Sequence, residues 1–304
     1  DGNIYANDRL CRKTLAQQRG LCVTVYDDNF RPPGGQRRWT TGPGWSEHDN
    51  GFRFAAMDNS ISWLTHHHLD IQQPGSVRDR YAYNPRQPRS RTRPVDEVLV
   101  TFELIAGDSP ARFFIELLIS SHRVRWTRDS AARTQSLSVD GRTVKSEPLK
   151  TPQPGKRLVF EFSTIDQTLR AAVDGQLVLP PLALAKPVAP RQPEPDELLR
   201  LGAAAGDLEI HGLRIDRDVY YRGSHGQHGT TSPWQLGPDE FFMLGDNSPV
   251  SLDSRSWPNP GVPRRLVIGR PLLVHLPSRQ WEVDLAGRRR HIRIPDVQRI
   301  RYIR

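Results

Sequence analysis

Between residues 21 and 215 the chain repeats one pattern: short runs of β-branched and aromatic residues separated by turn dipeptides such as Asp140-Gly141 and Asp174-Gly175. Many short strands with regular turn signals are typical of an all-β sandwich and not of βαβ units. The six prolines between residues 180 and 195 exclude a central strand or a helix, so a surface loop is expected there. Strands are expected at 21–26, 51–54, 61–64, 98–104, 112–120, 124–127, 135–139, 158–162, 168–173, 176–179, 199–201, 207–210 and 213–215.

The composition supports a folded protein with a core. The chain has 304 residues, of which 36% are hydrophobic, and no run of 18 apolar residues that would span a bilayer. Its two cysteines, Cys11 and Cys22, are too far apart for a CxxC redox pair and too few for a four-thiolate metal site. The spacing leaves two alternatives open, a disulfide or two small core residues.

The net charge of +9 raises the question of a nucleic-acid partner. Only five basic residues are lysine, a skew towards arginine that coding bias alone can produce. The basic residues are also spread along most of the chain, without the interleaved aromatic residues of a single-strand-binding surface. The sequence therefore predicts no nucleic-acid partner.

The beginning of the chain is expected to form a small hairpin. Residues 1–14 combine an Asp-Gly turn signal and a second turn at Asn7-Asp8 with short alternating stretches. The chain opens without an initiator Met, a charged leader or the apolar segment of a signal peptide, so we expect it to come from the inside of a longer protein.

Residues 237–255 contain the most specific pattern in the sequence. An apolar strand is expected at 241–244, followed by a sharp turn. Asp253 and Arg255 alternate with Ser254 and are placed to form a charge-assisted, bidentate pair that fixes the loop carrying Ser251. Taken without any comparison, these residues favour a polar surface turn.

The same residues resemble the Gly-Asp-Asn…Ser-x-Asp-Ser-Arg signature of type I signal peptidases. Residues 238–244 look like that family's strand entering the signature, and 267–277 look like its closing strand. Residues 1–8 are similar to the hairpin that follows the family's catalytic lysine. The positions that match the signature are Gly245, Asp246, Asn247, Ser251, Asp253, Ser254 and Arg255.

The resemblance implies hydrolysis by a serine nucleophile and a neutral lysine base. Neither residue is in this chain: no Ser-Met-x-Pro stretch occurs, and Lys13 follows the hairpin where the family's lysine precedes it. Ser251 matches the serine that orients the lysine amine, and Asp253 and Arg255 match a supporting salt bridge. Asp246 and Asn247 would shape the turn. We therefore expect the dyad to lie upstream of Asp1 and this chain alone to be inactive.

The resemblance covers the two ends of the chain and divides it into three parts. Residues 1–18 and 219–304 are expected to form two segments of a signal-peptidase-like β core. Residues 19–218 look like an inserted concanavalin- or laminin-G-like jelly roll, as in large signal peptidases of the planctomycete lineage. Such a protein removes signal peptides from exported preproteins at the extracytoplasmic face of the cytoplasmic membrane, held by an N-terminal anchor. No cofactor is implied.

An alternative is a non-catalytic binding module with a degenerate peptidase core. The sandwich would bind a protein partner or a glycan, with Trp45, Trp63 and Trp126 as a stacking platform, although sandwich tryptophans are more often core residues. His66-His67-His68 and the His225 and His228 pair could ligate a metal. Alternate strand positions face opposite sides, so a solvated turn and no metal are expected.

Overall fold

The computed structural model describes residues 2–30, 36–48, 51–70, 73–80, 92–119, 122–149, 153–184, 198–223, 228–269, 273–274, 278–285, 288–295 and 301–302. They form two compact units, Asp1–Tyr221 and Arg222–Arg304. The longest described helix, α1 (Leu15–Leu21), has seven residues, and none in the described ranges is long and apolar enough to cross a membrane.

The first unit begins with the expected hairpin. Strands β1 (Tyr5–Ala6) and β2 (Arg9–Leu10) pair antiparallel, with Ala6 opposite Arg9. The two turn residues, Asn7 and Asp8, have φ angles of 49° and 59°, the pattern of a type I′ turn, which matches the twist of the strands. Helix α1 follows, closed at its start by a capping box in which Thr14 and Gln17 bond to each other's backbone.

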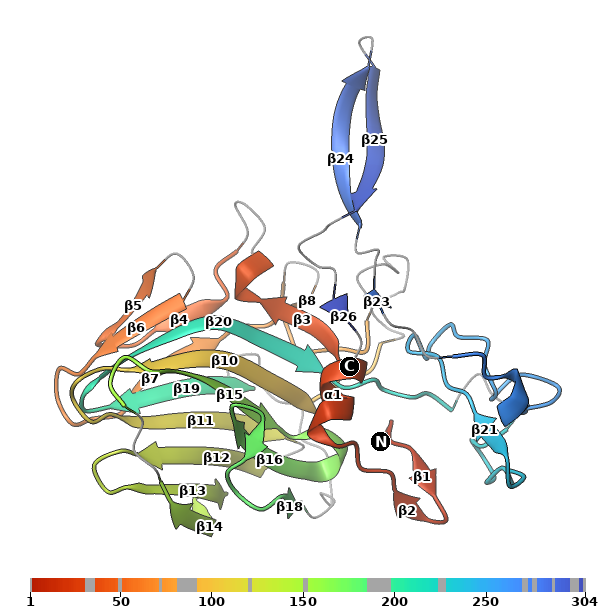
Figure 1. The fold of residues 1–304 in the computed structure, drawn as a ribbon. Helices are drawn as coiled ribbons and strands as arrows, with labels where there is room; N and C mark the ends of the chain where they lie inside the picture. The colour runs from red at the N-terminus through yellow and green to blue at the C-terminus, as the bar shows by residue number, and fades with distance from the viewer. Residues whose placement is uncertain are drawn as a thin grey trace. The chain divides into compact units, whose positions relative to one another are not determined.

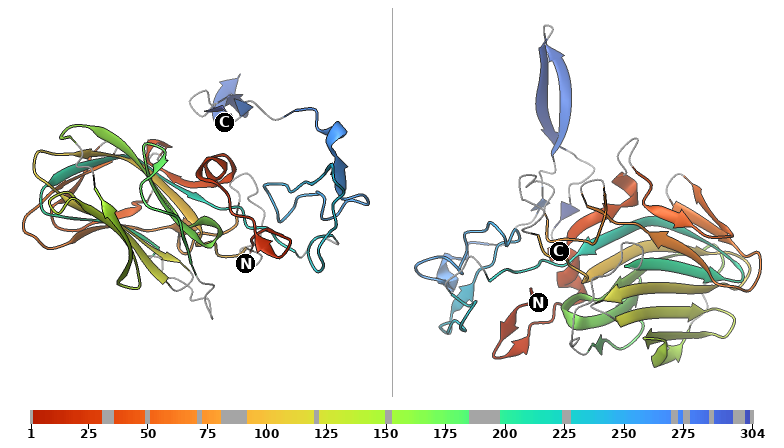
Figure 2. Two further views of the ribbon diagram at one scale, coloured as in Figure 1. Left: turned by 60° about the horizontal axis from the view of Figure 1, so that its bottom comes forward. Right: turned by 180° about the vertical axis from the view of Figure 1, so that it is seen from behind.

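The rest of this unit consists mainly of two antiparallel sheets, seen as two layers in Figures 1 and 2. A nine-stranded sheet has the order β17-β16-β15-β10-β20-β6-β5, with β18 beside β16 and β3 beside β20. Its strands are β3 (Val23–Asp27), β5 (Trp45–His48), β6 (Gly51–Ala55), β10 (Val98–Ala106), β15 (Arg157–Ser163), β16 (Thr168–Val173), β17 (Gln176–Leu177), β18 (Leu182–Ala183) and β20 (Asp207–Arg217).

The second layer is a seven-stranded sheet of order β14-β13-β12-β11-β19-β7-β4. Its strands are β4 (Trp39–Thr41), β7 (Ser62–His66), β11 (Arg112–Ile119), β12 (His122–Asp129), β13 (Thr134–Val139), β14 (Arg142–Pro148) and β19 (Leu199–Ala204). A two-stranded ribbon, β8 (Leu69–Asp70) with β9 (Gln73–Pro74), and short 3-10 turns at Asp28–Phe30 and Ile165–Gln167 complete the unit.

The core lies between the two sheets, because alternate residues of each strand point inward. Phe102 and Phe160 stack at 5.4 Å between ring centroids, and Trp126 packs against Phe160 at 5.5 Å. Trp45 and Trp126 are both buried in this core, so the stacking platform considered for them is wrong. Trp63 alternates with the buried Ser62 and Leu64 and faces outward.

Every strand expected from residues 21–215 overlaps an observed strand, and the fold is all-β as predicted. The two segments expected at 207–210 and 213–215 are one strand, β20. Strands β4, β5, β8, β9 and β14 were not anticipated, nor was β18, which lies within the loop expected at 180–195. Strand β14 is almost wholly exposed at a sheet edge, so it lacks the apolar alternation that reveals a half-buried strand.

The second unit contains short antiparallel pairs. Strand β21 (Glu240–Phe242) pairs with β22 (Gly261–Pro263), which leads into a 3-10 turn at Arg264–Leu266. Strand β23 (Leu273–Val274) pairs with β26 (Arg301–Tyr302), and β24 (Ser278–Leu285) pairs with β25 (Arg288–Pro295). The expected strand at 241–244 therefore ends at Phe242, and residues 267–269 are not in a strand.

The two ends of the first unit meet. The backbone N–H of Tyr221 donates to the carbonyl of Gly2 at 3.0 Å, and Gly2 leaves no room for a Cβ beside the Tyr220 ring. Cys11 and Cys22, which lie on either side of α1, are both free thiols, so the disulfide alternative is wrong. Cys11 is exposed and Cys22 is half-buried, so they are not two core residues either. Burial raises the pKa of the Cys22 thiol and keeps it protonated.

At two glycines of this unit, we expect an added methyl group to have opposite effects on the unfolding free energy. A Cβ on Gly51 would lie 1.9 Å from the Ile210 carbonyl oxygen, whereas one on Gly20 in α1 meets nothing within 4 Å. Gly51→Ala is expected to lower the unfolding free energy by about 1–3 kcal/mol. Gly20→Ala is expected to raise it by roughly 0.5 kcal/mol, because alanine loses less entropy in a helix. Urea denaturation measures both, and equal effects would contradict the close approach of β6 to β20.

Candidate functional site

The loop of the second unit is organised by a buried ion pair between Asp253 and Arg255. Arg255 donates from Nε to Asp253 Oδ1 at 2.8 Å and from Nη2 to Oδ2 at 2.6 Å. The two side chains are only 5% and 6% exposed. The backbone N–H groups of Gly245 and Arg255 also donate to this carboxylate, at 2.9 and 3.1 Å. The bidentate geometry that the alternating residues predict is therefore present.

These contacts decide the charge state of Asp253. Burial acts to raise its pKa, but the hydrogen bonds from Arg255 and from the backbone N–H groups outweigh burial and hold the pKa below its usual range. The carboxylate therefore stays ionised at neutral pH. It ties the start of the loop, at Gly245, to its end, at Arg255.

Arg255 has two further partners that the sequence did not reveal. Its Nη1 donates to the hydroxyl of Ser248 and to the carbonyl of Arg222, both at 2.7 Å. Ser248 is 1% exposed and also accepts a hydrogen bond from the backbone N–H of Arg222 at 2.8 Å. Ser248 precedes a proline in a polar stretch, a context with no periodicity or spacing that marks a buried partner.

Ser254 connects the loop to the end of β21. Its backbone N–H donates to the Met243 carbonyl at 3.1 Å, and its hydroxyl accepts from the Met243 N–H at 2.8 Å. The side chain is fully buried. Two hydrogen bonds therefore join Ser254 to Met243, as they would join two residues of neighbouring strands.

Asp246 and Asn247 form the turn. The Asp246 carboxylate accepts the N–H of Asn247 at 2.9 Å, and the Asn247 carbonyl accepts the N–H groups of Val250 and Ser251 at 3.1 and 3.0 Å. These short bonds reverse the chain and carry Ser251 back towards Gly245.

Ser251 packs directly over Gly245. A Cβ on Gly245 would stand 1.7 Å from Ser251 Oγ, so only glycine allows the hydroxyl to occupy this place. Within the described part of the chain no group forms a hydrogen bond with the Ser251 hydroxyl. The hydroxyl is thus fixed in position by packing and free to bond a further group.

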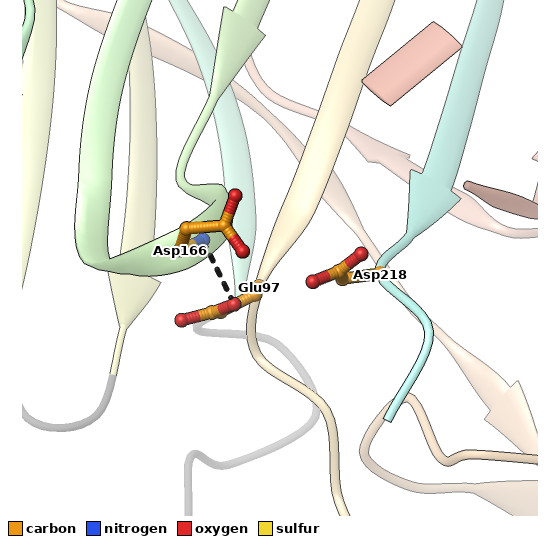
Figure 3. A group of neighbouring side chains, drawn as sticks. All are labelled: Glu97, Asp166 and Asp218. Atoms are coloured by element: carbon orange, nitrogen blue, oxygen red, sulfur yellow. Dashed lines mark hydrogen bonds between the residues drawn. The ribbon is translucent and has the colours of Figure 1, made fainter. Parts of the chain in front are cut away.

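Figure 3 shows a second polar cluster, in the first unit, that the sequence did not predict. One carboxylate oxygen each of Glu97, Asp166 and Asp218 lie within 4.8 Å of one another, close enough to suggest a metal site. The ammonium of Lys13 already lies between two of them, 2.5 Å from Asp166 Oδ1 and 3.1 Å from Asp218 Oδ2. A lysine therefore supplies the positive charge that a metal ion would bring.

Lys13 cannot serve as a general base in this position. Burial acts to lower its pKa, but the charges of Asp218 and Asp166 outweigh burial and raise the pKa above its ordinary value. The amine therefore stays protonated at neutral pH, whereas a lysine that acts as a base must be neutral.

Glu97 is the carboxylate of this cluster whose negative charge Lys13 does not pair with directly. Its carboxylate accepts the backbone N–H groups of Asp166 and Gln167, at 3.0 and 3.1 Å. Burial and the charge of Asp218 nevertheless raise its pKa to about 7. Glu97 therefore changes its charge near neutral pH.

The histidine run does not form the expected solvated turn. His66 ends β7 fully buried, 4.8 Å from the Trp39 ring and 5.2 Å from the Tyr26 ring, and burial holds its pKa well below the usual value. His68 is also buried, while the half-buried His67 contacts the Thr40 hydroxyl at 2.6 Å. The described residues offer no third metal ligand beside them. His225 lies outside the described residues.

The first unit is thus an antiparallel β-sandwich. The solved structures that resemble this chain do so only distantly. A protein of unknown function with a galectin-like fold from Bacillus subtilis is 9% identical, with a TM-score of 0.44, and covers 64% of this chain and 96% of its own. The carbohydrate-binding module CBM66 from Bacillus subtilis is also 9% identical, with a TM-score of 0.38, and covers 59% and 94%. At these scores neither likeness carries a conclusion about function.

The comparison with protein families is more specific. The family model described as signal peptidase, peptidase S26, matches residues 131–276, just under half of the chain. This match includes the whole loop from Gly245 to Arg255 and supports the signal peptidase family. No curated protein matches the chain.

Glu97 predicts a measurable pH dependence of stability. Its pKa is raised to about 7 in the folded protein, so the folded state holds a proton that the unfolded chain has released above pH 4.5. Stability is therefore lost as pH rises through 7. Relative to Glu97→Gln, the wild-type unfolding free energy should fall by on the order of 2 kcal/mol between pH 5 and 8.

Urea denaturation at several pH values measures this difference. Glutamine keeps one acceptor for two backbone N–H groups, so Glu97→Gln should cost about 1 kcal/mol at pH 5, where Glu97 is protonated. Glu103→Gln, which removes an exposed pair with Arg157, is the control and should show little pH dependence. A pH-independent difference for Glu97→Gln would contradict the assignment.

Proposed function

We propose that this chain is part of a type I signal peptidase, which removes signal peptides from exported preproteins by hydrolysis with a serine and lysine dyad. The observation that carries the proposal is the loop from Gly245 to Arg255. It follows the family's signature position by position, and it is held by a buried ion pair that leaves one hydroxyl, that of Ser251, without a partner among the described residues. The family match over residues 131–276 supports the same assignment.

Each loop residue has a role in this proposal. A lysine acts as a base only when its amine is neutral and points at the serine hydroxyl. The Ser251 hydroxyl forms a hydrogen bond with that amine and so orients it. Asp253 and Arg255 hold the loop that carries Ser251 and do not touch the substrate. Gly245 gives the Ser251 hydroxyl room, while Asp246, Asn247 and Ser254 shape and tether the turn.

The nucleophile and the base belong to a segment other than these 304 residues. The sequence contains no Ser-Met-x-Pro stretch, and Lys13 is held protonated between Asp166 and Asp218. We place the dyad upstream of Asp1, with an N-terminal anchor that fixes the enzyme at the extracytoplasmic face of the cytoplasmic membrane. Residues 1–18 and 219–304 would then form the peptidase core, and 19–218 an inserted sandwich.

A non-catalytic binding module with a degenerate peptidase loop is the second candidate. The observation that favours it is that the larger unit of the chain, Asp1–Tyr221, consists mainly of a β-sandwich and does not include the signature residues. A degenerate enzyme would keep the ion pair, which stabilises the loop, but would not need the Ser251 hydroxyl. Substitution of Ser251 therefore separates the two candidates.

Ser251→Ala is expected to lower signal-peptide cleavage by the full-length protein at least tenfold, because an unoriented lysine is a poor base. Thermal unfolding should be unchanged, since the hydroxyl bonds to nothing in the described structure. Ser256→Ala is the matched control: Ser256 lies one residue beyond the ion pair, is exposed, and bonds only to the Asp253 carbonyl at 3.1 Å. Equal turnover of the two variants would remove Ser251 from the mechanism.

The isolated 304-residue chain should not cleave a signal-peptide substrate, because it lacks the dyad. Incubation with a preprotein, followed by mass spectrometry of the products, measures this directly. Cleavage that persists after repurification would show that the chain holds its own nucleophile and base.

A further inference from the structure

Arg128 is a buried arginine on the inner face of the seven-stranded sheet. It alternates along β12 with Val124 and Trp126, which belong to the core between the sheets, and it is only 8% exposed. Its guanidinium carbon lies 4.8 Å from the centre of the Phe160 ring, on β15 of the opposite sheet, and 5.8 Å from the centre of the Trp126 ring. The charged group therefore lies between the two layers.

Within the described part of the chain, this guanidinium has no counter-ion. No described group accepts a hydrogen bond from the Arg128 side chain or forms an ion pair with it, and its Nη1 is fully buried. Burial lowers the pKa of Arg128 to about 10, and no carboxylate of the described residues acts to raise it. A group with this pKa is still charged at neutral pH. A full positive charge is thus held inside the sandwich without a negative partner among these residues.

The other two arginines of β12 differ from Arg128 in this respect. Arg125 donates from Nε to Glu116 Oε2 at 2.7 Å, and Arg123 donates from Nη1 to Glu116 Oε1 at 2.7 Å. Both lie on the outer face of the sheet, where their side chains are 32% and 34% exposed. The two arginines that water still reaches therefore have a carboxylate partner, and the more deeply buried Arg128 has none among the described residues.

The aromatic rings offset only part of the cost of burying Arg128. A cation–π contact is weaker than the hydration that a guanidinium loses when it leaves water. A buried charge is tolerated when a partner of opposite sign accompanies it, because an unpaired charge in a core is strongly destabilising. An anion bound beside Arg128 would supply the charge that the described residues do not.

A second unsatisfied polar atom lies on the neighbouring strand. Gln135 on β13 is directly opposite Arg128, and it is also buried on the inner face. Its amide donates from Nε2 to the Val178 carbonyl at 3.1 Å, which fixes the amide and leaves Oε1 buried without a donor. Directly opposite residues on one face are close enough to share a ligand. Arg128 thus offers an unused donor, and Gln135 an unused acceptor.

A hydrated anion satisfies both atoms. The anion accepts a hydrogen bond from Arg128, and one bound water donates a proton to the anion and the other to Gln135 Oε1. A single guanidinium balances a single negative charge, so a monovalent ion fits better than a dianion. The Phe160 and Trp126 rings beside it favour an ion that loses little hydration energy. Chloride and the carboxylate of a small acid share this chemistry.

We propose that Arg128 and Gln135 form a binding site for a small monovalent anion inside the β-sandwich. The site belongs to the first unit alone, so it is independent of whether the loop of the second unit supports a peptidase.

Urea denaturation of the 304-residue chain tests the site in sodium chloride, sodium formate and sodium gluconate at one sodium concentration. Gluconate has the same charge, but its carboxylate is attached to a large hydrated polyol that an enclosed site excludes. An anion present at about ten times its dissociation constant lowers the unfolding equilibrium constant roughly tenfold. We expect that decrease in chloride, in formate or in both, relative to gluconate. Equal unfolding in the three salts overturns the proposal.

The pattern of response identifies the anion. A decrease in chloride alone assigns the site to a halide, and a decrease in formate alone assigns it to a carboxylate. A saturable dependence on the concentration of the active salt is expected for a single site. A decrease that grows without saturation shows a general salt effect and overturns the proposal.

Variants locate the binding. Arg128→Met should abolish the response to the anion, and in gluconate it should be at least as stable as the wild type, because it removes an unpaired charge. Gln135→Leu should weaken the response severalfold and decides the location if Arg128→Met does not fold. Arg157→Met is the matched control, because Arg157 is 57% exposed and pairs with Glu103. A wild-type response in a folded Arg128 or Gln135 variant, or its loss in Arg157→Met, overturns the location.

Discussion

The apolar contact between the two sheets determines where every other side chain of the first unit can lie. Because side chains alternate along a strand, the burial of Phe102, Ile115 and Leu201 between the layers places their neighbours on the outer faces. A slip of one residue in β11 would exchange Ile115 for Glu116 and bury a charge in the core. The arrangement of Glu116 and its arginines is thus a consequence of the core register.

Sequence reasoning predicted the sandwich well because its signals are local. Alternation and turn dipeptides are visible within a few consecutive residues, and each run from 98–104 to 213–215 overlaps a strand. It failed where a strand has no buried face, as in β14, and where burial depends on distant neighbours. His66 looked solvated because the sequence cannot show that Trp39 and Tyr26 enclose it.

The candidate sites divide in the same way. Asp253 and Arg255 are two residues apart, so their pairing could be predicted from spacing. Ser248 and Arg222, which complete the environment of Arg255, could not, because one is a common loop residue and the other is 33 positions away in the sequence. Lys13 meets Asp166 across 153 positions, and no sequence pattern relates them. Long-range ion pairs follow from the fold and are not visible before it.

Three clusters of buried or half-buried charge among the described residues differ in how their carboxylates are compensated. Asp253 and Arg255 are matched one to one, and their pairing stabilises the loop that carries Ser251. Lys13 serves two aspartates and leaves Glu97 to change its charge near pH 7. Glu116 accepts hydrogen bonds from Arg123, Arg125 and Arg200, and Arg123 has a further interaction as well. The hydrogen bonds from these arginines outweigh burial and hold the pKa of Glu116 below its ordinary value, so the carboxylate is ionised and ties three strand residues together on the outer face of the sheet.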